Sequence, residues 1–222
     1  MTARTRQGGI SLLTVIVLVL LSGLLALWAS RSALFHELVV GNAADHQRAQ
    51  EAAEALLQDV QHDLALHHAS GIHPRAEQEH LLLPADSGAD FDVFVARLQS
   101  PTAANGCRHG LCMPRSSAID FWLHPPTLAQ MTQAGIGARY GDYTQAPAAN
   151  HHPLLTERNP GRGGWYWIEV LRHQPTEGGD AAWGPNVRAP LLYRITALAQ
   201  GLKAGSQVVL QTVVAFPAIA GE

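Results

Sequence analysis

An uncharged apolar run stands near the start of the chain. From Ile10 to Ser30 the sequence contains no Asp, Glu, Lys or Arg, and about 20 apolar residues in a helix match the thickness of a bilayer core. We predict that residues 10–30 form the membrane-spanning half of a long helix. Arg4 and Arg6 precede the run and favour a cytoplasmic N-terminus, although Arg31 on its far side weakens this preference.

A helical pattern continues beyond the apolar run. Apolar residues recur at the i, i+3, i+4, i+7 and i+11 spacing of one helix face. These are Ala53, Leu56, Leu57, Val60 and Leu64, and the polar residues between them include Glu51, Glu54, Asp59 and Asp63. We predict that residues 31–66 form the amphipathic half of the same helix. Such a helix is either a stalk that packs on its own head or, in addition, an element of lateral assembly, and the periodicity fits both.

The remaining residues, 67–222, are expected to form one globular head. Gly and Pro residues between 67 and 89 predict the end of the helix and a loop. Short segments rich in β-branched or aromatic residues predict strands at 91–98, 119–123, 165–171, 192–198 and 207–214. Gly201 and Gly205 separate the last two segments, which favours an antiparallel hairpin. A long helix followed by an antiparallel sheet predicts the α+β class.

Three aromatic residues lie next to one another in the segment 165–171. The alternation of a strand would place Trp165 and Trp167 on one face and Tyr166 on the other. We expect these side chains in the core. A patch that binds a ligand or a partner is the alternative, since Trp and Tyr are frequent interface anchors.

The charge balance bears on the class of partner. The formal net charge is -3 and the isoelectric point is about 6.4. Nothing in the chain is basic enough to predict a nucleic-acid partner.

Cys107 and Cys112 are the two cysteines of the chain and enclose four residues. We predict that they pair in a structural disulfide if the head lies in an oxidising compartment. Their spacing differs from the Cys-x-x-Cys of thioredoxin-like redox sites, and two cysteines alone do not make a tetrahedral zinc site.

Histidine pairs raise the possibility of a metal site. They are His67 and His68, with His73 nearby, and His151 with His152. No His-Glu-x-x-His pattern, Gly-x-Ser-x-Gly elbow or phosphate-binding Gly-x-x-x-x-Gly-Lys loop is present. We therefore predict no catalytic, cofactor-binding or metal-ligating residues and no enzymatic activity. A membrane-anchored envelope enzyme or metal-binding protein that uses the histidine pairs is the competing hypothesis.

A basic leader, residues 1–9, ends in Gly8-Gly9 directly before the apolar run. A secretory signal would be cleaved after its apolar stretch, whereas here the helical pattern continues past that stretch. The predicted cut therefore falls before Ile10. Cleavage after Gly9 is expected, with cleavage after Gly8 as the alternative.

Several parts of this N-terminal region together resemble one family. Gly9 followed by residues 10–14 resembles a prepilin peptidase site, and residues 31–34, 40–45 and 48–56 closely resemble the N-terminal signature of PilX-type minor pilins of type IV pili. The signature positions are Gly41, Asn42, Asp45, Ala52, Ala53 and Glu54. Residues 110–112, 193–196 and 208–211 are similar to the ectodomain of that family more loosely.

The resemblance implies a type IV pilin-like fold, with the long N-terminal helix packed on an antiparallel sheet head. It also implies removal of the leader by a prepilin peptidase and methylation of the new Ile10 amine. Most pilins carry a glutamate where this chain has Thr14. PilX-type proteins and K-type pseudopilins of type II secretion often lack that glutamate as well.

The resemblance further implies a place for the chain and a set of partners. The expected function is that of a non-catalytic minor pilin that helps to initiate pilus assembly in a priming or tip complex. Its expected partners are other minor pilins, the major pilin, a tip adhesin, the prepilin peptidase and the bacterial inner membrane, with the head in the periplasm. A K-type-like minor pseudopilin is the alternative from the same superfamily.

Overall fold

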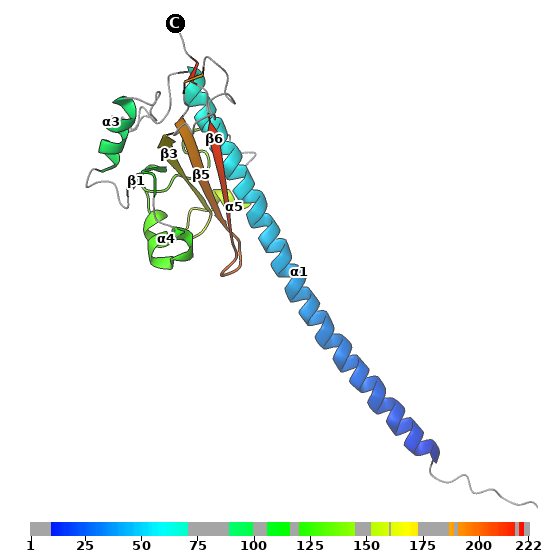
Figure 1. Ribbon diagram of the computed structural model, residues 1–222. Helices are drawn as coiled ribbons and strands as arrows, with labels where there is room; N and C mark the ends of the chain where they lie inside the picture. Colours follow the sequence, from blue (N-terminus) through cyan, green and yellow to red (C-terminus); the bar gives the residue numbers. More distant parts are fainter. Residues whose placement is uncertain are drawn as a thin grey trace, which may run out of the picture. The chain divides into compact units, whose positions relative to one another are not determined.

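One long helix, α1 (Ile10–Ser70), occupies the N-terminal third of the chain. The computed structural model describes residues 10–70, 89–99, 106–115, 120–144, 152–159, 161–172, 187–188, 191–215 and 218–219 (Figure 1). The chain divides into two units, Met1–Ala44 and Asp45–Glu222, and α1 contributes residues to both. The helix extends four residues beyond Leu66, where the apolar periodicity predicted its end.

The second unit is built on a five-stranded sheet with the order β1-β2-β3-β5-β6. Its strands are β1 (Cys107–Arg108), β2 (Leu111–Cys112), β3 (Gly164–Arg172), β5 (Leu191–Gln200) and β6 (Gln207–Ala215). All neighbouring pairs are antiparallel except β2 and β3, which run parallel. Two short strands, β4 (Val187–Arg188) and β7 (Ala218–Ile219), pair separately. The α+β class is therefore confirmed, and the parallel pair is an addition to it.

The predicted hairpin at the C-terminal end of the sheet is confirmed. β5 and β6 pair without interruption from Leu192 opposite Ala215 to Gln200 opposite Gln207. β3 lies between β2 and β5, and its residues from Gly164 to Val170 are all buried. A strand that is covered on both faces reads as a continuous apolar run, which explains why this segment was easy to identify from the sequence.

The predicted strand at 91–98 is wrong, because these residues belong to helix α3 (Ala89–Leu98). Phe91, Phe94 and Leu98 are spaced three and four residues apart and are 8%, 2% and 1% exposed. Asp92 and Arg97, between them, are exposed. The segment is short and rich in Phe and Val, which suggested a strand, but its burial follows the helical period.

The predicted strand at 119–123 is also wrong over its described part, since Ile119 lies outside the described residues. Residues Phe121–Leu123 form a 3-10 helix, η1, which is followed by helix α4 (Pro125–Met131). Pro125 stands in the first turn of α4, where a missing N–H costs nothing. The aromatic side chains had suggested a strand. Instead, Phe121 packs against one face of the sheet, and its ring centroid lies 4.8 Å from that of Trp167.

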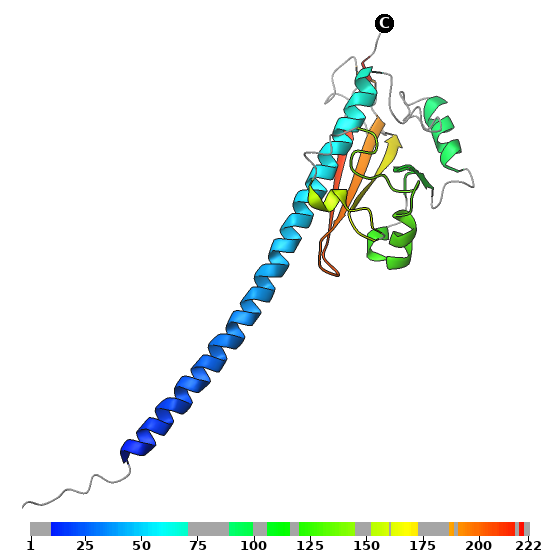
Figure 2. The same cartoon turned by 180° about the vertical axis from the view of Figure 1, so that it is seen from behind.

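Two apolar clusters fill the two faces of the sheet. On one face Tyr166, Ile168 and Ile195 pack with residues of α1, and on the other face Trp165 and Trp167 pack with α4 and η1. Figures 1 and 2 show the second-unit part of α1 alongside β5 and β6. The predicted opposite orientation of Tyr166 and the two tryptophans is confirmed, and all three side chains are in the core at 2% exposure or less.

A tight turn joins β1 and β2. His109 and Gly110 form its two central positions, with φ angles of 50° and 78°, as the type I′ turn of a two-residue hairpin requires. Their N–H groups donate to the carbonyl oxygens of Gly135 and Ile136 at 2.7 and 2.8 Å, and the Gly110 carbonyl accepts from Ile168 N–H at 2.7 Å. The turn is therefore held between two other segments of the head.

Gly110→Ala should destabilise the head by roughly 2 to 4 kcal/mol, because strain at positive φ adds to overpacking. An added Cβ at this position would lie 2.5 Å from the Ala138 Cβ. Gly205 is the matched control, since its φ is 82° but no atom lies within 4 Å of an added Cβ. Gly205→Ala should cost about 1 kcal/mol. Urea unfolding of the detergent-solubilised chain measures both, and equal losses would contradict the packing argument.

Candidate functional site

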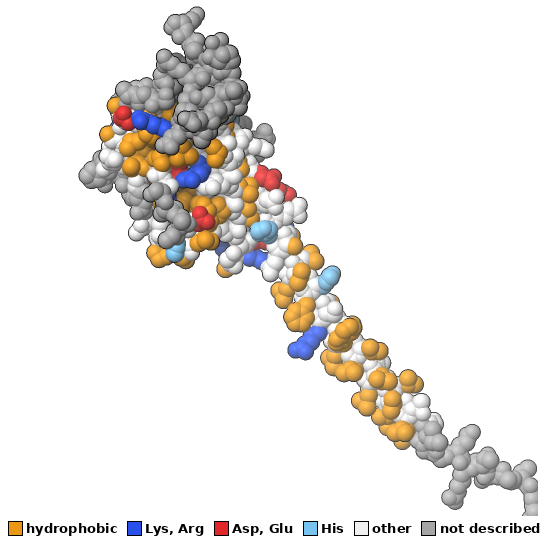
Figure 3. Space-filling model, in the orientation of Figure 1, with side chains coloured by type: hydrophobic (Ala, Val, Ile, Leu, Met, Phe, Trp, Pro, Cys, Tyr) orange, Lys and Arg blue, Asp and Glu red, His pale blue; other side chains and the backbone are white. Residues whose placement is uncertain are grey.

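The first part of α1 presents an apolar surface. An 18-residue window of this helix has a mean hydropathy of 2.7, and none of that window is buried. Figure 3 shows hydrophobic side chains along the helix, and Leu24 and Leu25 are each 64% exposed. By length and composition α1 can cross a membrane. Thr14 lies in this part of the helix, whereas Gly9 lies outside the described residues.

Asp45, one of the signature positions, joins α1 to the turn between β5 and β6. Its carboxylate accepts hydrogen bonds from the backbone N–H groups of Leu202 at 2.9 Å and Lys203 at 3.0 Å. Burial alone would raise the pKa of Asp45, but these two hydrogen bonds and the charge of Lys203 hold it below its ordinary value of 3.8. The ionised carboxylate therefore belongs to the folded head.

The other signature positions fall into different environments. Ala52 and Ala53 are fully buried against the sheet, where small side chains permit a close approach of the helix. Glu54 is exposed, and its Oε1 accepts a hydrogen bond from Gln50 Nε2 at 3.0 Å. Gly41 and Asn42 lie in the first unit. The structure therefore brings Asp45, Ala52 and Ala53 into one contact region and leaves Glu54 on its solvent side.

Asp59 makes a second connection between α1 and the rest of the head. Its carboxylate accepts from Gly141 N–H at 2.8 Å and from the Thr144 hydroxyl. Burial raises the pKa of Asp59, although both hydrogen bonds oppose that rise. The sequence pattern placed Asp59 and Asp63 among the polar positions of the helix, but they are 7% and 0% exposed. Helical periodicity indicated only that these positions are polar, because the turn that contains Gly141 lies 82 residues away from Asp59 along the chain.

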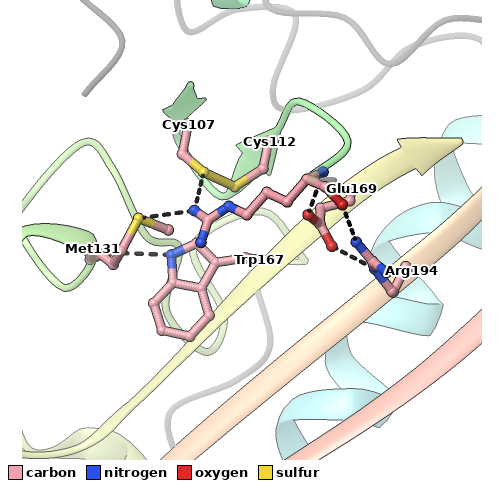
Figure 4. Close-up of a disulfide and its surroundings, with 7 residues drawn as sticks. Cys107, Cys112, Met131, Trp167, Glu169 and Arg194 are labelled. Carbon is pink, nitrogen blue, oxygen red and sulfur yellow. Dashed lines mark hydrogen bonds and ion pairs between the residues drawn. A yellow bond between two sulfur atoms is a disulfide. The ribbon is translucent and has the colours of Figure 1, made fainter. Parts of the chain in front are cut away.

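The predicted disulfide between Cys107 and Cys112 is present, and both residues are buried (Figure 4). It closes the ends of the β1–β2 hairpin, where Cys107 lies opposite Cys112. Cys112 in turn lies beside Glu169 of β3. The covalent link therefore fixes the hairpin that forms the edge of the sheet.

Arg115 connects this hairpin to α4 and η1. Its Nη2 lies 3.2 Å from Cys107 Sγ and 3.1 Å from Met131 Sδ, and its guanidinium lies over the Phe121 ring at 4.5 Å from the centroid. Burial lowers the pKa of Arg115, and the opposing effect of Glu169 is smaller. The cation is thus enclosed by sulfur atoms and an aromatic face.

Glu169 lies at the centre of the neighbouring polar contacts. Its Oε2 accepts from Arg194 Nε at 2.5 Å, and its Oε1 accepts from the Arg115 backbone N–H at 3.2 Å (Figure 4). The hydrogen bond to Glu169 raises the pKa of Arg194. Sequence reasoning missed these three residues, because they are far apart along the chain and the pairing of β2, β3 and β5 brings them together. Their contacts join β2, β3 and β5 of the sheet.

A groove of about 810 Å³ lies between α4 and the segment that contains Arg139. Arg139 lies over the Trp165 ring at 4.5 Å and donates to the carbonyl oxygens of Glu157 and Arg162, each at 2.9 Å. Arg158 stands on the same groove and pairs with Asp142 at 3.8 Å. The groove is lined by apolar residues such as Leu128 together with these charged groups, and Arg139 supports the neighbouring backbone through its two hydrogen bonds.

The histidine pairs are only partly within the described residues. His152 precedes helix α5 (Pro153–Thr156), and its Nδ1 accepts from Leu154 N–H at 3.3 Å, as a helix cap does. The side chains of His67 and His68 are not described, and His73 and His151 lie outside the described residues. Among the side chains that are described, no group of three metal-ligating residues comes together.

Asp45→Ala should destabilise the chain by roughly 1 to 3 kcal/mol at neutral pH, because it leaves two N–H groups without their charged acceptor. Glu54→Ala, at an exposed signature position, should change stability by less than about 0.5 kcal/mol. Urea unfolding measures both variants in detergent. Equal losses in the two variants would contradict the assigned role of Asp45.

The contribution of Asp45 to the free energy of unfolding depends on pH, and the direction of this dependence follows from its pKa. Because the pKa of Asp45 is lowered in the folded state, its contribution is fully present above the ordinary value of 3.8 and is lost as the pH falls through the folded pKa. The difference in unfolding free energy between the unsubstituted chain and Asp45→Asn should therefore shrink as the pH falls below the ordinary value of 3.8. A difference that is constant with pH would contradict the ionised state.

Comparison with known proteins adds one finding to this geometry. The model of the family described as type IV pilus assembly protein PilX, C-terminal part, matches residues 100–215, which is more than half of the chain. The match includes the disulfide hairpin, α4, β3 and the β5–β6 hairpin. No curated protein and no solved structure matches the chain. The match over this length shows that the chain belongs to the PilX family of type IV pilus assembly proteins.

Proposed function

We propose that the chain is a minor pilin that helps to initiate a type IV pilus as part of a priming or tip complex. The observation that carries the proposal is the combination of a PilX-family head with an exposed apolar helix at the N-terminus. The subunit acts by binding other subunits and catalyses no reaction. Its partners are other minor pilins, the major pilin and a tip adhesin.

The proposed organisation of the chain follows from the sequence pattern. Residues 1–9 are a leader that is removed, 10–30 cross the inner membrane once, 31–66 form the amphipathic part of the helix, and 67–222 form a periplasmic head. The contacts of Asp45 and Asp59 support the packing of the amphipathic part on the head. After assembly the subunit lies in or at the tip of the extracellular pilus.

The proposed processing step makes this chain the substrate of a prepilin peptidase. The peptide bond between Gly9 and Ile10 is hydrolysed, and the new Ile10 amine is methylated. Ile10, which belongs to α1, then becomes the first residue of the chain. Thr14 carries no charge. At this position in the apolar part of α1 the subunit therefore has no carboxylate that would need a neighbour's amine as its partner.

Gly9→Ala should abolish leader removal, because a side chain at the position before the cut obstructs the peptidase site that the resemblance implies. Intact mass and N-terminal sequence of the membrane-extracted chain, with and without a co-expressed prepilin peptidase, measure this. The unsubstituted chain should lose Met1 to Gly9 only when the peptidase is present. Loss of Met1 to Gly8 would move the cut by one residue, and an unprocessed chain in every case would contradict the minor-pilin assignment.

Deletion of the gene should reduce the number of pili per cell at least tenfold and leave the length distribution of the remaining pili unchanged. The reason is that a priming complex is needed once for each filament, whereas elongation uses other subunits. Electron microscopy of the native host counts the pili. The unsubstituted chain should restore the number and Gly9→Ala should not. Normal piliation together with a defect in type II secretion would favour the pseudopilin alternative.

A further inference from the structure

β6 forms one edge of the five-stranded sheet. It pairs with β5 over its full length, from Gln207 to Ala215, and no other described strand lies beside it. The opposite edge is β1, which is only two residues long. β6 is therefore the long edge of the described sheet, and its free side is a place where a further strand can pair.

The hydrogen-bond pattern shows which backbone groups are available there. In an antiparallel pair, residues alternate between bonding to the partner strand and pointing away from it. Gly201 N–H donates to the Ser206 carbonyl at 2.9 Å next to the turn, which sets the phase of the alternation. Counting along the register, the residues whose N–H and C=O groups point away from β5 are Gln207, Val209, Gln211, Val213 and Ala215. No backbone hydrogen bond joins these five residues to another segment of the described chain.

This edge lacks the features that normally prevent strand addition. Natural edge strands are usually protected by charged residues, proline or a β-bulge. β6 reads Gln-Val-Val-Leu-Gln-Thr-Val-Val-Ala, so it contains no charged residue, no proline and no glycine. Its register with β5 is continuous and has no bulge. The side chains of Gln211 and Val213 lie on the same face of β6. Gln211 is exposed and Val213 is 55% exposed.

We propose that β6 accepts an extended strand from a neighbouring pilus subunit. A row of alternating N–H and C=O groups is satisfied by another strand and by no other regular element. Charge complementarity narrows the choice of partner segment, because an uncharged edge pairs best with an uncharged strand. In addition, β-branched residues opposite Val209 and Val213 give favourable cross-strand contacts. The partner segment is thus extended, uncharged, free of proline and rich in Val, Ile or Thr. That it comes from a pilus subunit rests on the proposed function.

The test uses the full chain, co-expressed with a prepilin peptidase and purified in detergent micelles. The probe is a synthetic peptide of about seven alternating threonines and valines with two lysines at each end for solubility. Hydrogen–deuterium exchange measured by mass spectrometry follows the fragment that contains β6. At about 1 mM peptide, exchange in this fragment should slow at least tenfold, whereas the fragments from α4 and β3 should not change.

Val213→Pro is the decisive variant, because it removes an N–H that points away from β5 and leaves the bonds between β5 and β6 in place. It should abolish the slowing with a thermal midpoint within about 3 °C of the unsubstituted chain. Val213→Ala is the matched control and should keep the slowing. A peptide with proline in place of its central valine should have no effect on the unsubstituted chain.

Three results would overturn the proposal. They are no slowing at the stated peptide concentration, slowing that persists in Val213→Pro, and slowing without peptide that grows with the concentration of the chain. The last result would identify a second copy of this chain as the occupant of the edge. Leader removal is read from the intact mass of the same preparations, so failure at β6 and failure of the minor-pilin assignment are distinguished.

Discussion

The close packing of one face of α1 on the sheet is the contact on which the head depends. Ala49, Ala52 and Ala53 are fully buried there, and Leu56, Val60 and Leu64 continue the same face without exposure. Small residues in the first turns bring the helix axis near the strands, and larger residues farther along fill the space beyond. This face buries Tyr166 and Ile168 of β3, so the central strand has an apolar neighbour on each side. Asp45 and Asp59 then fix the helix along its own axis through backbone donors of two separate turns.

The opposite face of the sheet is organised differently. There a single cation, Arg115, contacts the disulfide, Met131 and Phe121, and its backbone N–H reaches Glu169. The arrangement joins the β1–β2 hairpin, the consecutive elements η1 and α4, and strand β3. These contacts also explain how a hairpin with only two residues in each strand is stable at a sheet edge. The disulfide links its two strands, and Arg115 contacts the sulfur of Cys107.

The long and strongly periodic parts of the fold could be predicted from the sequence. α1, β3 and the β5–β6 hairpin each repeat one pattern over nine or more residues, so a single atypical position does not change the assignment. The segments 91–98 and 119–123 are shorter and aromatic, and their conformation depends on where the Phe side chains find partners. Phe94 packs as part of a helix face and Phe121 packs on Trp167, which no local pattern indicates.

The candidate site shows the same division. Asp45 was identified as a signature position, but its two backbone partners lie 157 and 158 residues away along the chain, so its role became visible only in the fold. Glu169 and Arg194 lie 25 residues apart and meet through strand pairing. The disulfide was predictable because its two residues are near neighbours. The cut at Gly9 and the role of Thr14 depend on the peptidase and the assembled pilus, and they stay predictions.

The position of the two cysteines also determines how the chain matures. Because Cys107 and Cys112 are the two cysteines of the chain and are separated by five positions, oxidation within one molecule has a single product. The thiols meet by closure of a short loop, which occurs far faster than the pairing of distant strands. The two thiols can thus meet before the sheet has formed, and isomerisation of wrong disulfides within the molecule is not a step in its biogenesis.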